Sequence, residues 1–291
     1  MPNLNELLTT NQQKRLVIAK VMATFTLLGF IQVDPDYTES LRSFSNLNPS
    51  IDESKLVKFT LPDGNLYTLR PDITSSLLQQ FIPSMQASDQ AKLSYASTYF
   101  RQSAAGLNIA SQIGFETYGQ VAIKERYQPL FSLLSLLKQR IKLVISYPSL
   151  ILDWVEKRTL STSEKKRLMA TIRMKAVDAI PSFSFTTEEQ TYLRSILQTV
   201  YTVQTLPAWA RRAFNQEEFT IFNQEAMVFD LSGLAQYDYY SGVYIEGYMA
   251  GYARPVVMGG TYDKRTEVYG NSIQAFGLSF DMDMLIREVN V

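Results

Sequence analysis

The sequence predicts an α+β fold in which helices flank an antiparallel sheet and a helical insertion interrupts the order of the strands. Apolar residues recur at helical spacing over residues 4–30. Two aromatic-rich segments, 92–100 and 113–118, predict a pair of antiparallel strands. The chain then becomes amphipathic and charged, which is typical of surface helices, and we place the insertion at 151–222.

Short local signals define the remaining elements. Gly29 is expected to end the first helix, and Asp63-Gly64 provides the turn of a hairpin. The small and polar residues 102–112 are expected to form a long loop between the two aromatic strands. The other predicted elements are a strand at 30–33, hairpin strands at 55–60 and 66–69, a helix at 73–81, a helix at 125–141, a strand at 141–146, and a last helix from about 281.

Composition restricts the chemistry of this 291-residue chain. Lys plus Arg and Asp plus Glu both number 28, so net charge offers no field that would gather nucleic acid. Cys and His are absent, which excludes thiolate nucleophiles, Cys-ligated metals and imidazole bases. No signal peptide or apolar run of membrane-spanning length is evident, and we expect a soluble, cytoplasmic protein without cofactor or metal.

Several segments carry a recognisable pattern in chain order. They are LGFIQVDPDYTES (28–40), YTLRPDIT (67–74), YFRQSAAGLNIASQIGFETYG (99–119), YDYYSG (237–242), GGTYD (259–263) and AFGLSFDMDML (275–285). Together they resemble the core of class II aminoacyl-tRNA synthetases, with histidyl-tRNA synthetase as the nearest pattern. The resemblance implies one synthetase-like domain over 1–291, although Gly259 and Gly260 alone are equally consistent with a tight turn.

The same resemblance implies that the residues needed for adenylate formation are largely missing. Arg101 matches the α-phosphate ligand of the family, but the loop that follows it carries no charge. Ala235 stands where the catalytic arginine is expected, and Met284 stands where the nucleotide-binding arginine is expected. Because an anionic transition state requires preorganised cations, we expect no catalytic residues, and Arg101 is at most a vestigial phosphate ligand.

The amino-acid pocket is better retained. By resemblance, the histidine ligands are Asp72, Thr74, Gln112, Glu116, Tyr239 and Tyr240. Carboxylates and amide oxygens can accept hydrogen bonds from an α-ammonium group, and a carboxylate with a tyrosine hydroxyl can meet both imidazole nitrogens. Asp72 replaces the longer glutamate that is usual in the family.

A histidine pocket without the adenylation residues resembles the regulatory subunits of ATP phosphoribosyltransferase. That family implies a non-catalytic chain that activates a short-form catalytic subunit in histidine biosynthesis and transmits feedback by L-histidine. We expect a homodimer within a hetero-oligomer, with no nucleic acid or membrane partner. The chain ends eight residues after Asp283, and we expect no C-terminal anticodon-binding domain.

Other interpretations remain open at this stage. The chain could be a divergent histidyl-tRNA synthetase or a stand-alone amino-acid-binding protein. Without the resemblance, Glu116 is more simply a strand residue paired with a basic neighbour. The tyrosines at 237–240 are consistent with sheet packing, and Arg101 with a structural ion pair.

Overall fold

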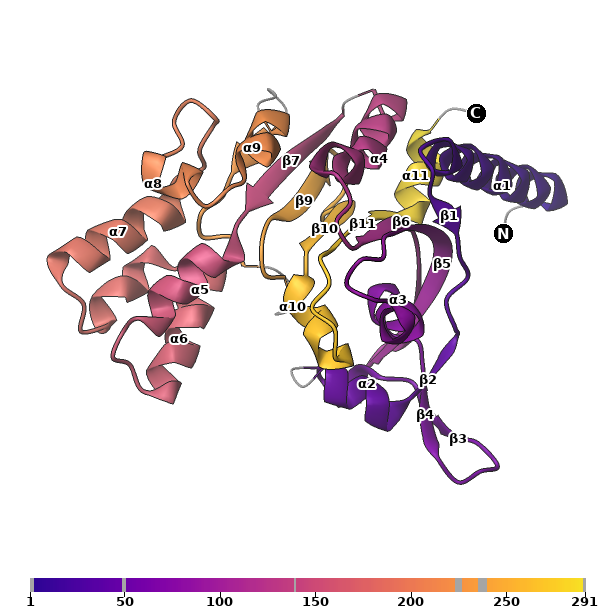
Figure 1. Cartoon of the computed structure of the whole chain (residues 1–291), viewed down its shortest axis with the longest axis horizontal. Helices are drawn as coiled ribbons and strands as arrows, with labels where there is room; N and C mark the ends of the chain where they lie inside the picture. The colour runs from indigo at the N-terminus through magenta and orange to yellow at the C-terminus, as the bar shows by residue number, and fades with distance from the viewer. Residues whose placement is uncertain (1–2, 49–50, 139, 223–226, 235–239, 290–291) are drawn as a thin grey trace. The chain divides into compact units, whose positions relative to one another are not determined.

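The computed structural model describes all residues except 1–2, 49–50, 139, 223–226, 235–239 and 290–291. The chain divides into two compact units (Figure 1). Unit 1 comprises residues 1–138 and 262–291, and unit 2 comprises residues 139–261. Both units combine helices with strands, which confirms the predicted α+β class.

The sheet of unit 1 contains β1 (Ile31–Gln32), β5 (Ala91–Ser103), β6 (Gly106–Tyr118) and β11 (Ala275–Asp281) in the order β1-β5-β6-β11. The β5–β6 and β6–β11 pairs are antiparallel, whereas β1 runs parallel to β5. The sheet that was predicted to be antiparallel therefore contains one parallel pair, at its β1 edge.

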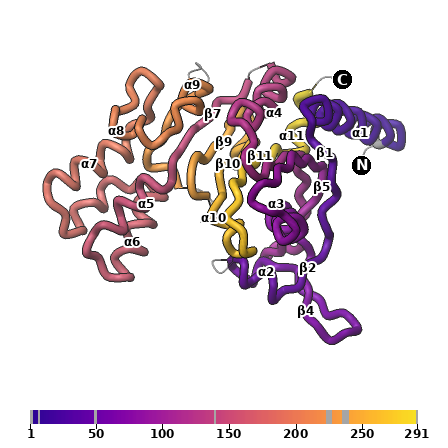
Figure 2. Tube along the Cα trace, viewed as in Figure 1, coloured from indigo at the N-terminus to yellow at the C-terminus, as the bar shows by residue number. Residues whose placement is uncertain are grey.

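A second, three-stranded sheet in unit 1 has the order β2-β4-β3, with β2 at Thr38–Ser40, β4 at Leu66–Leu69 and β3 at Lys58–Thr60. Helices connect and cover the two sheets (Figure 2). The helices are α1 (Leu4–Leu27), α2 (Leu41–Leu47), α3 (Ile73–Phe81), α4 (Ile123–Leu136), α10 (Asp263–Thr266) and α11 (Met282–Glu288), with 3₁₀ turns η1 (Glu53–Lys55), η2 (Ile82–Ser84) and η4 (Glu267–Tyr269).

The predicted loop at 102–112 is wrong. The strands β5 and β6 pair along their whole length, from Ala91 opposite Tyr118 to Ser103 opposite Gly106. Two residues close this hairpin, and Gly106 accommodates the turn with a φ of 110°. The small and polar residues that indicated a loop instead alternate with Leu107 and Ile109 on a regular ladder.

The two faces of β6 contact different parts of unit 1, because successive side chains of a strand point to opposite faces. Phe115 lies on the core face, where its ring centroid is 5.6 Å from that of Phe25 in α1 and 5.5 Å from that of Phe30. Phe276 of β11 extends this cluster to Tyr127 of α4, at 4.8 Å between centroids. Glu116 points to the other face, toward α3.

Unit 2 contains β7 (Ile141–Ser146), β8 (Met227–Phe229), β9 (Tyr244–Met249) and β10 (Val257–Thr261) in the order β10-β9-β7-β8. β8 pairs parallel with β7, and the other pairs are antiparallel. Its helices are α5 (Pro148–Glu156), α6 (Thr162–Arg173), α7 (Thr187–Gln198), α8 (Ala208–Arg211) and α9 (Gln216–Ile221), with the 3₁₀ helix η3 (Val177–Ser182).

Helices occupy most of the segment that we assign to an insertion, but its boundaries stay a prediction. The suggested tight turn at Gly259 and Gly260 is wrong, because both glycines lie within β10. The helix predicted at 125–141 ends earlier, at Leu136. Among the described residues, no helix is both long and apolar enough to span a lipid bilayer.

We expect Phe115→Ala to lower the free energy of unfolding by about 3–5 kcal/mol, because it removes a fully buried ring from the aromatic cluster. Urea unfolding followed by circular dichroism measures this change. Leu107→Ala is the matched control on the same strand, since Leu107 is 55% exposed and should cost no more than about 0.5 kcal/mol. Equal effects of the two substitutions would contradict the assignment of the core face.

Candidate functional site

Glu116 is the most buried carboxylate of the predicted ligand set, with 1% of its surface exposed. Two hydroxyl groups from other elements hold it. Thr74 Oγ1 in α3 donates a hydrogen bond to Oε1 at 2.9 Å, and the Tyr262 hydroxyl donates to Oε2 at 2.5 Å. Both carboxylate oxygens are therefore satisfied inside the protein, as a buried acid requires.

The neighbouring strand makes room for this carboxylate. Gly277 of β11 lies directly opposite Glu116 in the antiparallel register. A Cβ atom at position 277 would overlap the Glu116 carboxylate, and no shift of a flexible side-chain end could relieve the clash with the Phe115 carbonyl. Gly114, two residues before Glu116 and on the same face, similarly makes room for the Tyr95 ring.

Burial raises the pKa of Glu116 to about 8, and the nearby charge of Asp72 adds to the increase. The hydrogen bonds from Tyr262 and Thr74 and the charge of Arg265 oppose it. Burial likewise raises the pKa of Tyr262 well above its ordinary value. The tyrosine therefore remains a hydrogen-bond donor while Glu116 titrates near neutral pH.

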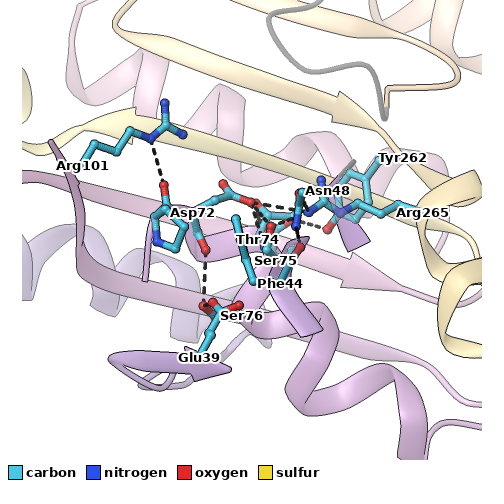
Figure 3. A network of polar contacts seen from close by, with 12 residues as sticks. Glu39, Phe44, Asn48, Asp72, Thr74, Ser75, Ser76, Arg101, Tyr262 and Arg265 are labelled. Atoms are coloured by element: carbon cyan, nitrogen blue, oxygen red, sulfur yellow. Dashed lines mark hydrogen bonds and ion pairs between the residues drawn. The ribbon is translucent and has the colours of Figure 1, made fainter. Parts of the chain in front are cut away.

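A second group of polar side chains surrounds Asp72, the N-cap of α3 (Figure 3). One Asp72 oxygen accepts hydrogen bonds from the backbone N–H of Ser75 at 2.9 Å and from the Ser75 hydroxyl. Arg265 of α10 lies 4.0 Å from the same carboxylate, donates to the Ser75 hydroxyl, and donates to Asn48 Oδ1 at 2.5 Å. Since Arg265 is only 4% exposed, it is a buried cation beside the acidic residues.

Glu39 of β2 is a further buried acid in this region. It accepts a hydrogen bond from the Ser76 hydroxyl of α3 (Figure 3). Burial raises the pKa of Glu39 to about 7, while the Ser76 hydrogen bond opposes the increase. The charge of Asp72 raises this pKa as well, and those of Arg265 and Arg70 lower it. Asp72 therefore raises the pKa of both buried glutamates.

The structure brings Asp72, Thr74 and Glu116 together in unit 1. Gln112 is half-buried and lies four residues before Glu116 on β6, hence on the same face of the sheet. Tyr240 belongs to unit 2, where its ring packs 4.7 Å from that of Tyr244. Tyr239 lies outside the described residues, as does Ala235.

Arg101 has a structural role in unit 1. Its Nε donates a hydrogen bond to the Pro71 carbonyl at 3.1 Å, just before α3 (Figure 3). Its guanidinium also lies 5.4 Å from the ring centroid of Tyr99. These contacts position the start of α3, so the cation is engaged by its own chain.

Sequence reasoning missed several members of this network. Tyr262 belongs to the quoted GGTYD segment and Glu39 to the first quoted segment, but neither was assigned a contact. Nothing in the sequence distinguishes Arg265 from a surface charge, because it follows Asp263-Lys264 in a charged run. Among the described residues, no group of acidic side chains has an arrangement that could hold a metal ion.

Comparison with known proteins adds to this geometry. The family model described as histidyl-tRNA synthetase matches residues 5–285. The chain belongs to this family. It is also similar to an ATP phosphoribosyltransferase regulatory subunit of Oceanobacillus iheyensis, with 23% identity over 94% of this chain and 73% of that protein.

Two solved structures share the fold of the chain. An ATP phosphoribosyltransferase regulatory subunit/histidyl-tRNA synthetase from Bacillus halodurans aligns with a TM-score of 0.80 and 19% identity over 97% of this chain and 80% of that chain. The ATP phosphoribosyl transferase (HisG:HisZ) complex from Thermotoga maritima aligns with a TM-score of 0.68 and 18% identity over 91% of this chain and 96% of that chain. The class II synthetase-like fold inferred from the motifs is therefore confirmed.

We expect Glu116→Gln to reduce the dependence of stability on pH. The raised pKa of Glu116 means that the folded state binds its proton more tightly, so this contribution is complete below the unfolded pKa and is lost as pH rises through about 8. Between about pH 5 and about pH 9, wild type should lose at least about 1.4 kcal/mol more unfolding free energy than the variant.

Urea unfolding at a series of pH values measures this difference. Glu267→Gln is the matched control, because Glu267 is exposed in the same unit. Parallel pH profiles for wild type and Glu116→Gln would contradict the assigned titration. Glu39 is present in both proteins, and its titration therefore contributes to both pH profiles.

Proposed function

We infer that this chain is a non-catalytic regulatory subunit of ATP phosphoribosyltransferase in histidine biosynthesis. The observation that carries this inference is similarity to regulatory subunits over nearly the whole chain, 94% for the Oceanobacillus protein. We propose that the chain activates a short-form catalytic subunit and transmits feedback inhibition by L-histidine. The proposal includes a cytoplasmic location for both subunits.

The positions that a synthetase uses to stabilise the adenylation transition state support a non-catalytic role. Met284, where the resemblance expects an arginine, is fully buried in α11. The β5–β6 turn contains Ala104 and Ala105 without any charge. Arg101 is engaged by the Pro71 carbonyl. Because each lost charge-stabilising donor costs roughly 2.7–4 kcal/mol in the transition state, these positions together are incompatible with efficient adenylation.

The polar network of unit 1 supports histidine as the effector. In the proposal, Glu116 and Thr74 meet the imidazole, and Asp72 accepts from the α-ammonium group. Gln112 adds an amide on the same face of the sheet. Tyr240 remains a proposed ligand from unit 2. Arg265 lies 4.0 Å from the Asp72 carboxylate and partly offsets the negative charge of that residue.

The proposed regulation is a coupling of free energies. Histidine favours an inhibited arrangement of the complex, and the substrates favour the active one. Allosteric coupling is typically about 1–3 kcal/mol, which corresponds to a change in affinity of about 5- to 150-fold. Linkage requires the same factor in both directions, so saturating substrates must weaken histidine binding as much as histidine weakens theirs.

Apolar side chains along α1 support the proposed homodimer. Leu4 and Leu8 lie one turn apart in α1 and are 69% and 59% exposed. Exposed apolar residues that are neighbours on one helix face favour an association surface more than scattered ones do. In the proposal, this helix contributes to contacts between two copies of the chain, and the pair assembles with the catalytic subunit.

The deciding experiment follows ATP-dependent consumption of phosphoribosyl pyrophosphate by a short-form catalytic subunit. Activity is measured without this chain, with it, and with added histidine. Activation by this chain, followed by inhibition by histidine, is the expected result. The absence of activation, combined with histidine-dependent ATP–pyrophosphate exchange by this chain alone, would establish a divergent synthetase instead.

We expect Glu116→Ala to weaken histidine binding by about tenfold or more, because a hydrogen bond to a charged group is worth roughly 1.5–3 kcal/mol. Isothermal titration calorimetry on the purified chain measures the dissociation constant. Glu267→Ala should bind histidine as wild type does, since this glutamate is exposed outside the network. Unchanged affinity in Glu116→Ala would move the histidine site elsewhere while leaving the activation assay unaffected.

A further inference from the structure

A separate pocket lies entirely within the helices of unit 2. It is an open hollow of about 580 Å³ bounded by α5 and the two residues that follow it, the beginning of α7, and α8. Trp154, Tyr192 and Trp209 form its aromatic wall. The Trp154 and Tyr192 rings stack with 5.4 Å between centroids, and Trp209 lies 5.6 Å from Tyr192. The volume is within the range of small-ligand sites.

One cation of the chain already occupies part of this wall. The Arg158 guanidinium lies 4.2 Å from the ring centroid of Trp154, and its Nε is 2.8 Å from Glu189 Oε1. The pair thus combines stacking on an indole with an ion pair to a carboxylate, the two interactions that a planar guanidinium makes best. The pocket therefore contains an internal example of guanidinium recognition.

The rest of the pocket lining presents the same two kinds of group, an indole ring and carboxylates, to solvent. Trp209 is 43% exposed, which is high for such a large apolar ring. Asp153 and Glu188 are exposed lining residues, each a carboxylate at the rim. Lys157 is the second cation of the lining, so its acids outnumber its bases by three to two. The residual charge favours a cationic ligand over an anionic one.

We propose that this pocket binds the guanidinium group of an arginine, stacked on Trp209 and paired with Asp153 or Glu188. The group can belong to free arginine or to an arginine side chain of a protein. The inference concerns unit 2 alone, and it does not rest on the proposed regulatory function.

Intrinsic fluorescence offers a direct test, because the only two tryptophans of the sequence, Trp154 and Trp209, both line this pocket. The full chain is titrated with N-acetyl-arginine amide, which models a side chain within a protein, and in parallel with free arginine. N-acetyl-citrulline amide is the matched neutral control, since it keeps the shape and loses the charge. We expect a saturable change in emission with the arginine probe and at least about tenfold weaker binding of the citrulline probe.

Two variants of the pocket locate the binding. Asp153→Asn combined with Glu188→Gln should weaken binding of the arginine probe by about tenfold, and Trp209→Leu should weaken it similarly while Trp154 still reports. Asp178→Asn combined with Glu217→Gln removes two exposed acids of unit 2 outside the pocket and should leave binding unchanged. Circular dichroism verifies that each variant is folded.

Each outcome decides the proposal. If the capped amide binds more strongly than free arginine, the guanidinium that the pocket recognises belongs to a protein side chain. If free arginine binds more strongly, the ligand is the free amino acid. The absence of a saturable response, equal binding of citrulline, or unchanged affinity in the pocket variants would each overturn it.

Discussion

The hydrogen-bonded burial of Glu116 is the constraint on which the candidate site depends. Its two oxygens are held by Thr74 of α3 and Tyr262 ahead of α10, so one carboxylate joins three separate parts of unit 1. Gly277 provides the space that the carboxylate occupies between neighbouring strands. Because burial of an acid is costly without such partners, the surrounding residues are restricted in size and polarity by this single side chain.

The balance of charge in the network explains what kind of ligand it suits. Asp72 raises the pKa of both Glu39 and Glu116 through space, Arg265 lowers both, and the fully buried Arg70 also lowers that of Glu39. A transition state in which phosphate charge develops needs the reverse balance, with cations in excess. Three acids stand beside the buried Arg265 and Arg70 here, so this network has no such excess of cations, in agreement with the proposed loss of adenylation.

The sequence could predict the elements whose patterns are local, including α3 and the strand that carries Glu116. It could not predict that residues 102–112 are paired, because the small side chains there carry no strand preference and their ladder is set by the partner strand. Arg265 was unpredictable for a similar reason. Its burial depends on contacts with Asn48 and Ser75, which lie some two hundred residues away in the chain.

The raised pKa of Glu116 also gives a chain without histidine a group that titrates near neutral pH. For the proposed ligand, the free imidazole has an ordinary pKa of about 6.5, whereas burial raises the pKa of Glu116 to about 8. Between these values the ligand arrives neutral and the acid already holds one proton, so the complex can form a charge-assisted hydrogen bond without exchanging a proton with solvent. Below this interval the imidazole and Glu116 are both protonated, so one proton must be released for this hydrogen bond. Above the interval neither group carries the shared proton, so one must be taken up. The burial that destabilises an ionised Glu116 in the empty protein therefore makes it suited to an imidazole at neutral pH.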